Sequence, residues 1–169
     1  MAHVYRDSKL TVEQLKSLYE YDPETGSWTR LISSGGNLAG TPAGCVHPGG
    51  YIKLKIKGDA YMSHRLAWFY MTGEWPKNHI DHVNGLEGDN RWCNLREATN
   101  SENMLNRKMN KNNKTGVKGV SFDNQTQRWS VQVYYKKKNY KKRFDDFEVA
   151  CEFAEFLREE LHGEYARFE

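Results

Sequence analysis

Residues 80–106 combine signals for a strand, a turn, a second strand and a capped helix, and this succession constrains the fold more than any other feature. Asn84-Gly85 is a turn signal between two extended runs, so the runs can pair as an irregular hairpin, with the second run at 92–96. Thr99-Asn100-Ser101-Glu102 has the spacing of a capping box, which begins a helix. The segment therefore predicts an antiparallel hairpin followed directly by a helix.

Two adjacent side chains of the first strand, Asp81 and His82, should point to opposite faces, because side chains alternate along a strand. A carboxylate and a carboxamide, from Asp81 and Asn103, are hard oxygen ligands suited to magnesium, which takes one or two protein oxygens together with water and phosphate. A neutral imidazole has an unperturbed pKa of about 6.5, so His82 could accept a proton from an attacking water. These residue types fit metal-assisted hydrolysis of a phosphodiester.

The segment from about His64 to Asn106 resembles the HNH endonucleases, the ββα-metal nucleases, in the branch found in phage and intron-borne homing enzymes. The resemblance rests on Asp81-His82, Asn84-Gly85, Asp89-Asn90-Arg91, Asn94-Leu95 and Ser101-Glu102-Asn103. It implies that Asp81 and Asn103 bind the metal, Mg²⁺ or Mn²⁺, that His82 is the general base, and that Asn94 is the central asparagine bracing the hairpin. It also implies products with 5′-phosphate and 3′-hydroxyl ends.

The metal ligands of this segment have alternatives. An isolated Asp-His pair is usually a surface pair, and asparagine-rich loops usually only make turns. His79 shares the face of Asp81 and could approach the metal, or it could be a solvated rim histidine. Asn100 and Asn106 lie one helical turn either side of Asn103 and would replace it if the helix register is shifted. The alternative function is a DNA-binding regulator whose nuclease half is a relic.

The net charge of +3 conceals an uneven distribution along the chain. From Arg107 to Arg143, twelve Lys and Arg face one acid, which gives +11, whereas residues 144–169 hold nine acids and two arginines, which gives −7. The basic block is interleaved with Trp129 and several tyrosines. Basic residues mixed with aromatic ones indicate a nucleic-acid surface.

Residues 115–169 form the pattern of a second module with three strands and one helix. We expect strands at 119–122, 128–135 and 138–144, then a helix over 148–162. The apolar stripe predicted for that helix is Val149, Cys151, Phe153, Phe156, Leu157 and Leu161.

Three stretches of this module carry a second resemblance: Lys114-Thr115-Gly116-Val117-Lys118-Gly119-Val120, Arg128-Trp129 and Leu161-His162-Gly163-Glu164-Tyr165-Ala166. They resemble the Apetala/ethylene-response-factor type of DNA-binding domain, which implies a sheet laid into the DNA major groove. That family's arginine-rich first strand is replaced here by Ser121 and Asp123, so base contacts are not carried over to it.

We predict DNA contacts on both modules, and for the sheet residues a solvated face is the alternative. The candidates are Arg65, Arg107, Lys118, Arg128, Gln132, Tyr134, Lys141 and Arg143. Residues 107–114 lack apolar periodicity and indicate a basic linker, whose lysines could follow a phosphate backbone or only tether the modules.

Upstream of the hairpin, Thr11-Val12-Glu13-Gln14 is another capping box, which opens a helix to Tyr19 and is followed by a strand at 28–31. Residues 33–50 hold six glycines and should be a loop. Residues 51–57 alternate isoleucine and leucine with lysine, which predicts a half-buried strand whose lysines face phosphate or solvent. Ser63 can cap a helix that ends at Gly73.

No run approaches the roughly 18 apolar residues of a membrane span, and the N-terminus lacks a signal-peptide core. We therefore expect a soluble, intracellular protein, and the resemblance to phage nucleases implies the cytoplasm of a phage-infected bacterial cell. The three cysteines are too far apart for a disulfide framework or a CxxC zinc site.

From these patterns and resemblances we predict an α+β protein with three parts. They are an HNH nuclease module at 1–106, a basic linker at 107–114 and an Apetala/ethylene-response-factor-like domain at 115–169. It should act on double-stranded DNA as a homing-type nuclease. A monomer would nick one strand, and a dimer is the alternative.

Overall fold

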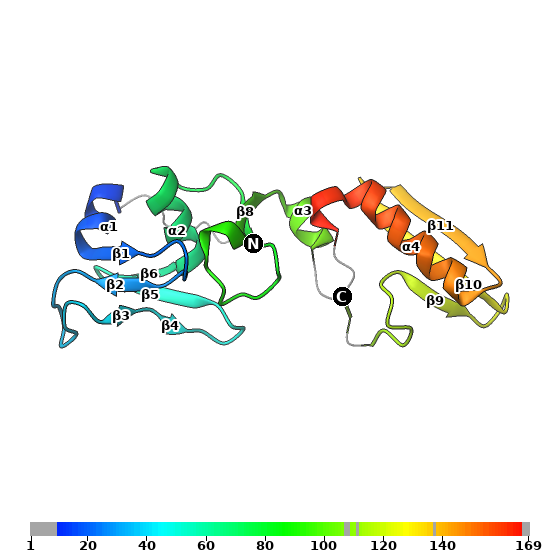
Figure 1. Ribbon diagram of the computed structural model, residues 1–169, viewed down its shortest axis with the longest axis horizontal. Helices are drawn as coiled ribbons and strands as arrows, with labels where there is room; N and C mark the ends of the chain where they lie inside the picture. The colour runs from blue at the N-terminus through cyan, green and yellow to red at the C-terminus, as the bar shows by residue number, and fades with distance from the viewer. Residues whose placement is uncertain (1–9, 107–108, 111, 137, 167–169) are drawn as a thin grey trace. The chain divides into compact units, whose positions relative to one another are not determined.

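The computed structural model describes residues 10–106, 109–110, 112–136 and 138–166. This part of the chain is of the α+β class, with four α-helices and small antiparallel sheets. The chain divides into two compact units, unit 1 up to Ala98 and unit 2 from Thr99 (Figure 1). Within the described residues, no helix is long and apolar enough to cross a membrane.

Unit 1 begins with α1 (Val12–Leu18), which leads into a sheet of β1 (Tyr19–Tyr21), β2 (Trp28–Arg30) and β3 (Pro42–Ala43) in that order. The predicted capping box of α1 is confirmed, because the Thr11 hydroxyl accepts from the Gln14 amide and the Gln14 side chain accepts from the Thr11 amide.

A second sheet has the order β4 (Cys45–Val46), β5 (Ile52–Ile56) and β6 (Asp59–Met62), and α2 (Ser63–Thr72) follows it. The expected loop at 33–50 is therefore interrupted by the short strands β3 and β4. Ser63 is not the N-cap of α2, since Met62 holds that position; the Ser63 hydroxyl instead accepts a hydrogen bond from Trp28 Nε1 at 3.0 Å.

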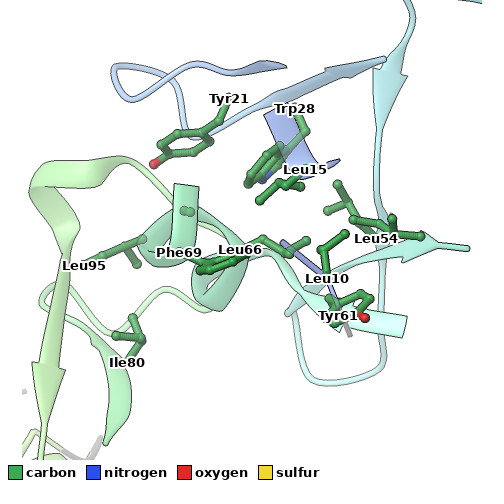
Figure 2. Packing of buried hydrophobic residues seen from close by; sticks show 12 residues of the cluster. Leu10, Leu15, Tyr21, Trp28, Leu54, Tyr61, Leu66, Phe69, Ile80 and Leu95 are labelled. Atoms are coloured by element: carbon green, nitrogen blue, oxygen red, sulfur yellow. The ribbon is translucent and has the colours of Figure 1, made fainter. Parts of the chain in front are cut away.

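The core of unit 1 gathers around α2. Figure 2 shows Leu66 and Phe69 of this helix between the N-terminal residues on one side and Ile80 and Leu95 on the other. Trp28, Leu15 and Leu54 are among the largest fully buried side chains. Burying apolar side chains of this size stabilises a fold by about 1.5–3 kcal/mol each, so this core fixes the strands that carry the site.

The last elements of unit 1 are β7 (His79–His82), a 3₁₀ turn at Trp92–Asn94 and β8 (Leu95–Ala98). β7 and β8 pair antiparallel, with Asp81 opposite Arg96, so the hairpin is confirmed. The expected extended run at 92–96 is wrong for its first three residues, because they turn so that the Asn94 amide donates to the Arg91 carbonyl.

Unit 2 contains α3 (Asn100–Leu105) and a sheet of β9 (Val120–Asp123), β10 (Arg128–Tyr135) and β11 (Lys138–Phe144), with β10 in the middle. The helix α4 (Phe147–His162) lies across this sheet (Figure 1), and a 3₁₀ turn, Gly163–Tyr165, follows it. Because α3 belongs to unit 2, the division falls before the predicted module limit at residue 106, and the limits 1–106, 107–114 and 115–169 stay predictions.

The apolar stripe predicted for α4 is partly wrong. Val149 and Phe156 are exposed, and the fully buried positions are Ala150, Ala154, Arg158 and His162. These four positions recur every four residues and form one face of the helix. Small side chains let the helix approach Val131 and Val133 of β10 closely, and the larger apolar residues of the stripe pack at the edges of this contact.

Candidate active site

The loop between β7 and β8 is held by the side chain of Asn94. Its Oδ1 atom accepts from the Asn84 amide at 2.9 Å, and its Nδ2 donates to Asn84 Oδ1 at 3.0 Å and to the Asp89 carbonyl at 2.8 Å. Asp89 binds Asn84 Nδ2 in turn, and the Arg91 guanidinium beside it lowers the pKa of Asp89 to about 2. One carboxamide thus spans the loop, the geometry that a bracing asparagine requires.

His82 ends β7 and is 5 % exposed. Its Nε2 lies 3.2 Å from Asn90 Oδ1, while Asn90 Nδ2 donates to the Gly88 carbonyl at 3.2 Å. Since the Asn90 oxygen can only accept, Nε2 of a neutral His82 carries the proton, and Nδ1 carries the lone pair. This is the tautomer that lets Nδ1 take up a proton.

Two aromatic side chains border the His82 ring. His64 of α2 meets it edge to face with 5.2 Å between ring centroids, and Tyr51 lies 6.1 Å from it. Burial lowers the pKa of His82 below its ordinary value, and the hydrogen bond to Asn90 opposes this shift. Burial also lowers the pKa of His64 to about 3, with His82 as the second cause. Both imidazoles are therefore neutral at neutral pH.

Asp81 is buried at 7 % exposure and is paired with Arg96, whose Nη2 lies 2.9 Å from Asp81 Oδ2 and whose Nε lies 3.0 Å from the same oxygen. A carboxylate has two oxygens with about four acceptor sites, and carboxylate oxygen is a ligand that divalent cations such as Mg²⁺ take. The described residues contain no cluster of three or more His, Cys, Asp or Glu that could hold a metal. The donor set fits a hard cation that keeps several waters, as Mg²⁺ does.

Asn103 lies on α3, which begins as predicted at a capping box. The Thr99 hydroxyl accepts from the Glu102 amide at 3.3 Å, and Glu102 Oε2 accepts from the Thr99 amide at 2.8 Å. Asn103 is half-buried, Asn100 is exposed, and Asn106 is buried at the end of the helix. α3 belongs to unit 2 and Asp81 to unit 1, so ligation by Asn103 stays a prediction.

The N-terminal segment supports the residue that holds His82. The Tyr21 hydroxyl donates to the Asn90 carbonyl at 2.6 Å, and the Trp92 amide donates to the Pro23 carbonyl at 2.9 Å. Gly26, with φ +72°, packs so closely that a Cβ there would lie 2.4 Å from the Asn90 carbonyl carbon. Only glycine fits this position, and the turn at 22–27 therefore packs directly against the backbone of the active-site loop.

The predicted DNA contacts of the second module lie mostly on the outer face of its sheet. Gln132, Tyr134 and Lys141 are exposed, and Gln132 is opposite Lys141 in the register. Arg128 is paired with Asp145 at 2.6 Å and Arg143 with Asp123 at 3.3 Å. Each of these contacts with DNA stays a prediction.

The remaining predicted contacts are placed differently. Arg65 is buried in the first turn of α2 and donates to the Asn78 carbonyl at 3.3 Å. The Lys118 carbonyl accepts from Arg158 Nε at 3.2 Å. Arg107 lies outside the described residues.

The hairpin places a carboxylate next to a buried neutral imidazole, an arrangement compatible with hydrolysis of a phosphodiester. The comparisons with known proteins define the class of the protein, a DNA-cleaving nuclease. Residues 61–105 match the family model of the HNH endonucleases. The chain is 34 % identical over 106 residues to "Protein 3.8" of Escherichia phage T7, an alignment that covers 62 % of this chain and 88 % of that protein. No solved structure matches the chain. The chain belongs to the HNH endonuclease family, whose members are generally metal-dependent.

Sequence reasoning assigned no role to three residues around His82. Asn90 belongs to a quoted motif, but nothing in that motif indicates that its side chain meets His82. His64 and Tyr51 come from elements 18 and 31 positions upstream, and only the folded core brings their rings to the site.

Proposed function

We propose that this chain is a homing-type endonuclease that nicks double-stranded DNA and leaves 5′-phosphate and 3′-hydroxyl ends. The observation that carries the proposal is the state of His82, a buried neutral imidazole whose Nε2 is engaged by Asn90. A base that is unprotonated at neutral pH and fixed in one tautomer is suited to activate water.

In this mechanism His82 Nδ1 accepts a proton from the water that attacks the scissile phosphorus in line with the leaving 3′ oxygen. Asn90 orients the ring, and Asn94 keeps the loop that carries Asn90 in shape through its three hydrogen bonds. Because the imidazole is already oriented in the folded protein, no conformational entropy is lost in orienting it during the reaction.

Asp81 and Asn103 are the proposed ligands of a divalent cation, Mg²⁺ or Mn²⁺. When bound, such a cation supplies positive charge at the phosphate and at the leaving oxygen. Arg96 of the paired strand β8 donates two hydrogen bonds to the Asp81 carboxylate and fixes its orientation. Asn100 and Asn106 are the substitutes for Asn103.

For unit 2 we propose a DNA-binding role of the Apetala/ethylene-response-factor type. The supporting observation is a three-stranded sheet covered by one helix, with Gln132, Tyr134 and Lys141 exposed on the strands. Arg107, Lys118, Arg128 and Arg143 complete the proposed set for unit 2, and Arg65 is the proposed DNA contact of unit 1. One reaction centre per chain is consistent with a nicking monomer, and a dimer would cut both strands.

The test is His82→Ala, assayed by conversion of supercoiled plasmid to nicked circles in MgCl₂. A general base contributes about 10²–10⁴-fold to the rate, so cleavage should slow by at least about 100-fold. DNA binding in EDTA should change little. His47→Ala is the matched control, because His47 is an exposed histidine of the same unit. Near-wild-type cleavage by His82→Ala would refute the assignment.

A further inference from the structure

A basic groove in unit 1 is lined by residues of the strands β2, β3, β4 and β5. Figure 1 shows these strands in unit 1. Arg30, Lys53, Lys55 and Lys57 line it together with apolar residues of the neighbouring strands. Of the described residues that line this groove, none is Asp or Glu. A concave surface with four positive charges and no acid attracts a polyanion.

The side chains of the three lysines of this groove form no ion pair with the residues that the structure describes. Across the β5–β6 pair, Lys53 faces Met62 and Lys55 faces Ala60, and Asp59 is opposite Ile56 instead. Within the part of the chain that the structure describes, no acid forms an ion pair with Lys53, Lys55 or Lys57. The Arg30 guanidinium is anchored by the Thr41 hydroxyl and the Pro42 carbonyl, which keeps it at the edge of the groove.

The lysine strand starts at the candidate active site. Tyr51, whose ring lies against both His82 and His64, immediately precedes β5. Lys53 and Lys55 point to one side because they are two residues apart in β5. Lys57 lies in the turn after β5, with φ 51°, and also lines the groove. At about 3.3 Å per residue, Lys57 lies roughly 20 Å along the chain from Tyr51.

We propose that this groove binds the phosphodiester backbone of the DNA that flanks the cleaved bond, on one side of it only. A rise of about 3.4 Å per base pair makes 20 Å equal to about six base pairs. The position of the groove relative to the cleaved bond rests on the proposed role of His82, because the Tyr51 ring at the start of β5 lies 6.1 Å from the His82 ring. The affinity of the groove for phosphate does not depend on that role.

The first test compares two variants of the full chain on a 40-base-pair duplex of mixed sequence in EDTA. In one variant Lys53, Lys55 and Lys57 are changed to Gln, and in the other they are changed to Arg. Each neutralised phosphate contributes about 0.9 to the slope of log binding against log salt. The Gln variant should therefore lose about 2.7 from the slope, and the Arg variant should keep it.

The proposal is overturned if the salt slope of the Gln variant falls by less than about two, or if the slope of the Arg variant falls as much as that of the Gln variant. Lys16→Gln is the control for a lysine of the same unit on α1, and its slope should not change. If the triple Gln variant does not unfold cooperatively on heating, Lys55→Gln alone is measured. It should lose about 0.9 from the slope, and an unchanged slope overturns the proposal.

The second test shortens the duplex on one side of the nick or on the other. Wild-type affinity should drop when one flank, and not its counterpart, falls below about six base pairs. The Gln variant should be insensitive to that same flank. Equal losses of affinity in the wild type and the Gln variant, whichever flank is shortened, overturn the one-sided contact. Failure of the proposed role of His82 would instead leave His82→Ala active, with no effect on either salt slope.

Discussion

His64 makes the stability of unit 1 dependent on pH in a way that can be calculated. It is 7 % exposed, and its Nδ1 has no hydrogen-bond partner among the described residues. Burial, then His82, then Arg65 lower its pKa from 6.5 to about 3. Below pH 6.5 the unfolded chain binds a proton that the folded chain does not. The free energy of unfolding therefore falls as the pH falls from about 6.5 towards 3.

The size of this effect follows from the two pKa values. Between pH 7 and pH 4.5 the linkage removes about 2.5 kcal/mol of stability. His64→Phe keeps a ring of similar size but cannot be protonated. Over the same interval the variant should therefore lose about 2.5 kcal/mol less than the wild type. Titrating groups that do not contact His64 are common to both proteins, and their contributions cancel in the comparison.

The assay is urea denaturation at pH 7 and at pH 4.5, followed by tryptophan emission in a Trp129→Phe background. Four of the five tryptophans belong to unit 1, at 28, 68, 75 and 92, so the remaining emission reports on that unit. His47→Phe, at an exposed position, should lose as much stability on acidification as the wild type. If His64→Phe also shows the same loss as the wild type, burial does not hold His64 neutral and the reasoning is refuted.

Two further predictions concern the metal and the second module. Asp81→Ala and Asn103→Ala should each lower the cleavage rate and raise the Mg²⁺ concentration for half-maximal cleavage; unchanged Mg²⁺ titrations in both would point to Asn100 or Asn106. Deleting residues 114–169 removes nine of the twelve basic residues in 107–143, so weak and less selective nicking should survive with a smaller salt slope. A truncated chain with the specificity and slope of the full chain would locate recognition in the N-terminal half.

The elements that the sequence predicts best are those set by neighbouring residues. Both capping boxes, at Thr11 and Thr99, are found as expected, because each needs only four consecutive residues. The turn at Asn84 is equally local, since its side chain accepts from the Leu86 amide at 2.9 Å. Such signals act within one turn of chain and do not depend on the rest of the fold.

The features that sequence reasoning missed depend on distant contacts. The Tyr21 hydroxyl reaches the Asn90 carbonyl across 69 positions, and no local pattern predicts such a pair. On α4 the choice of buried face depends on which residues fit against β10, so alanines are buried while the larger Phe156 is exposed. Hydrophobicity alone does not identify a buried face that consists of two alanines, an arginine and a histidine.

The hydrogen bonds from the N-terminal turn to the active-site loop limit which fragments of this nuclease can be grafted into another protein. The stretch that matches the HNH endonuclease family begins at residue 61, but Tyr21, Pro23 and Gly26 all act on Asn90 or its neighbours. A graft of residues 61–105 into another scaffold would carry His82 and Asn90 without the residues that hold them together. A fragment that keeps the active-site loop in place must therefore start upstream of the matched stretch and include at least residues 21–26.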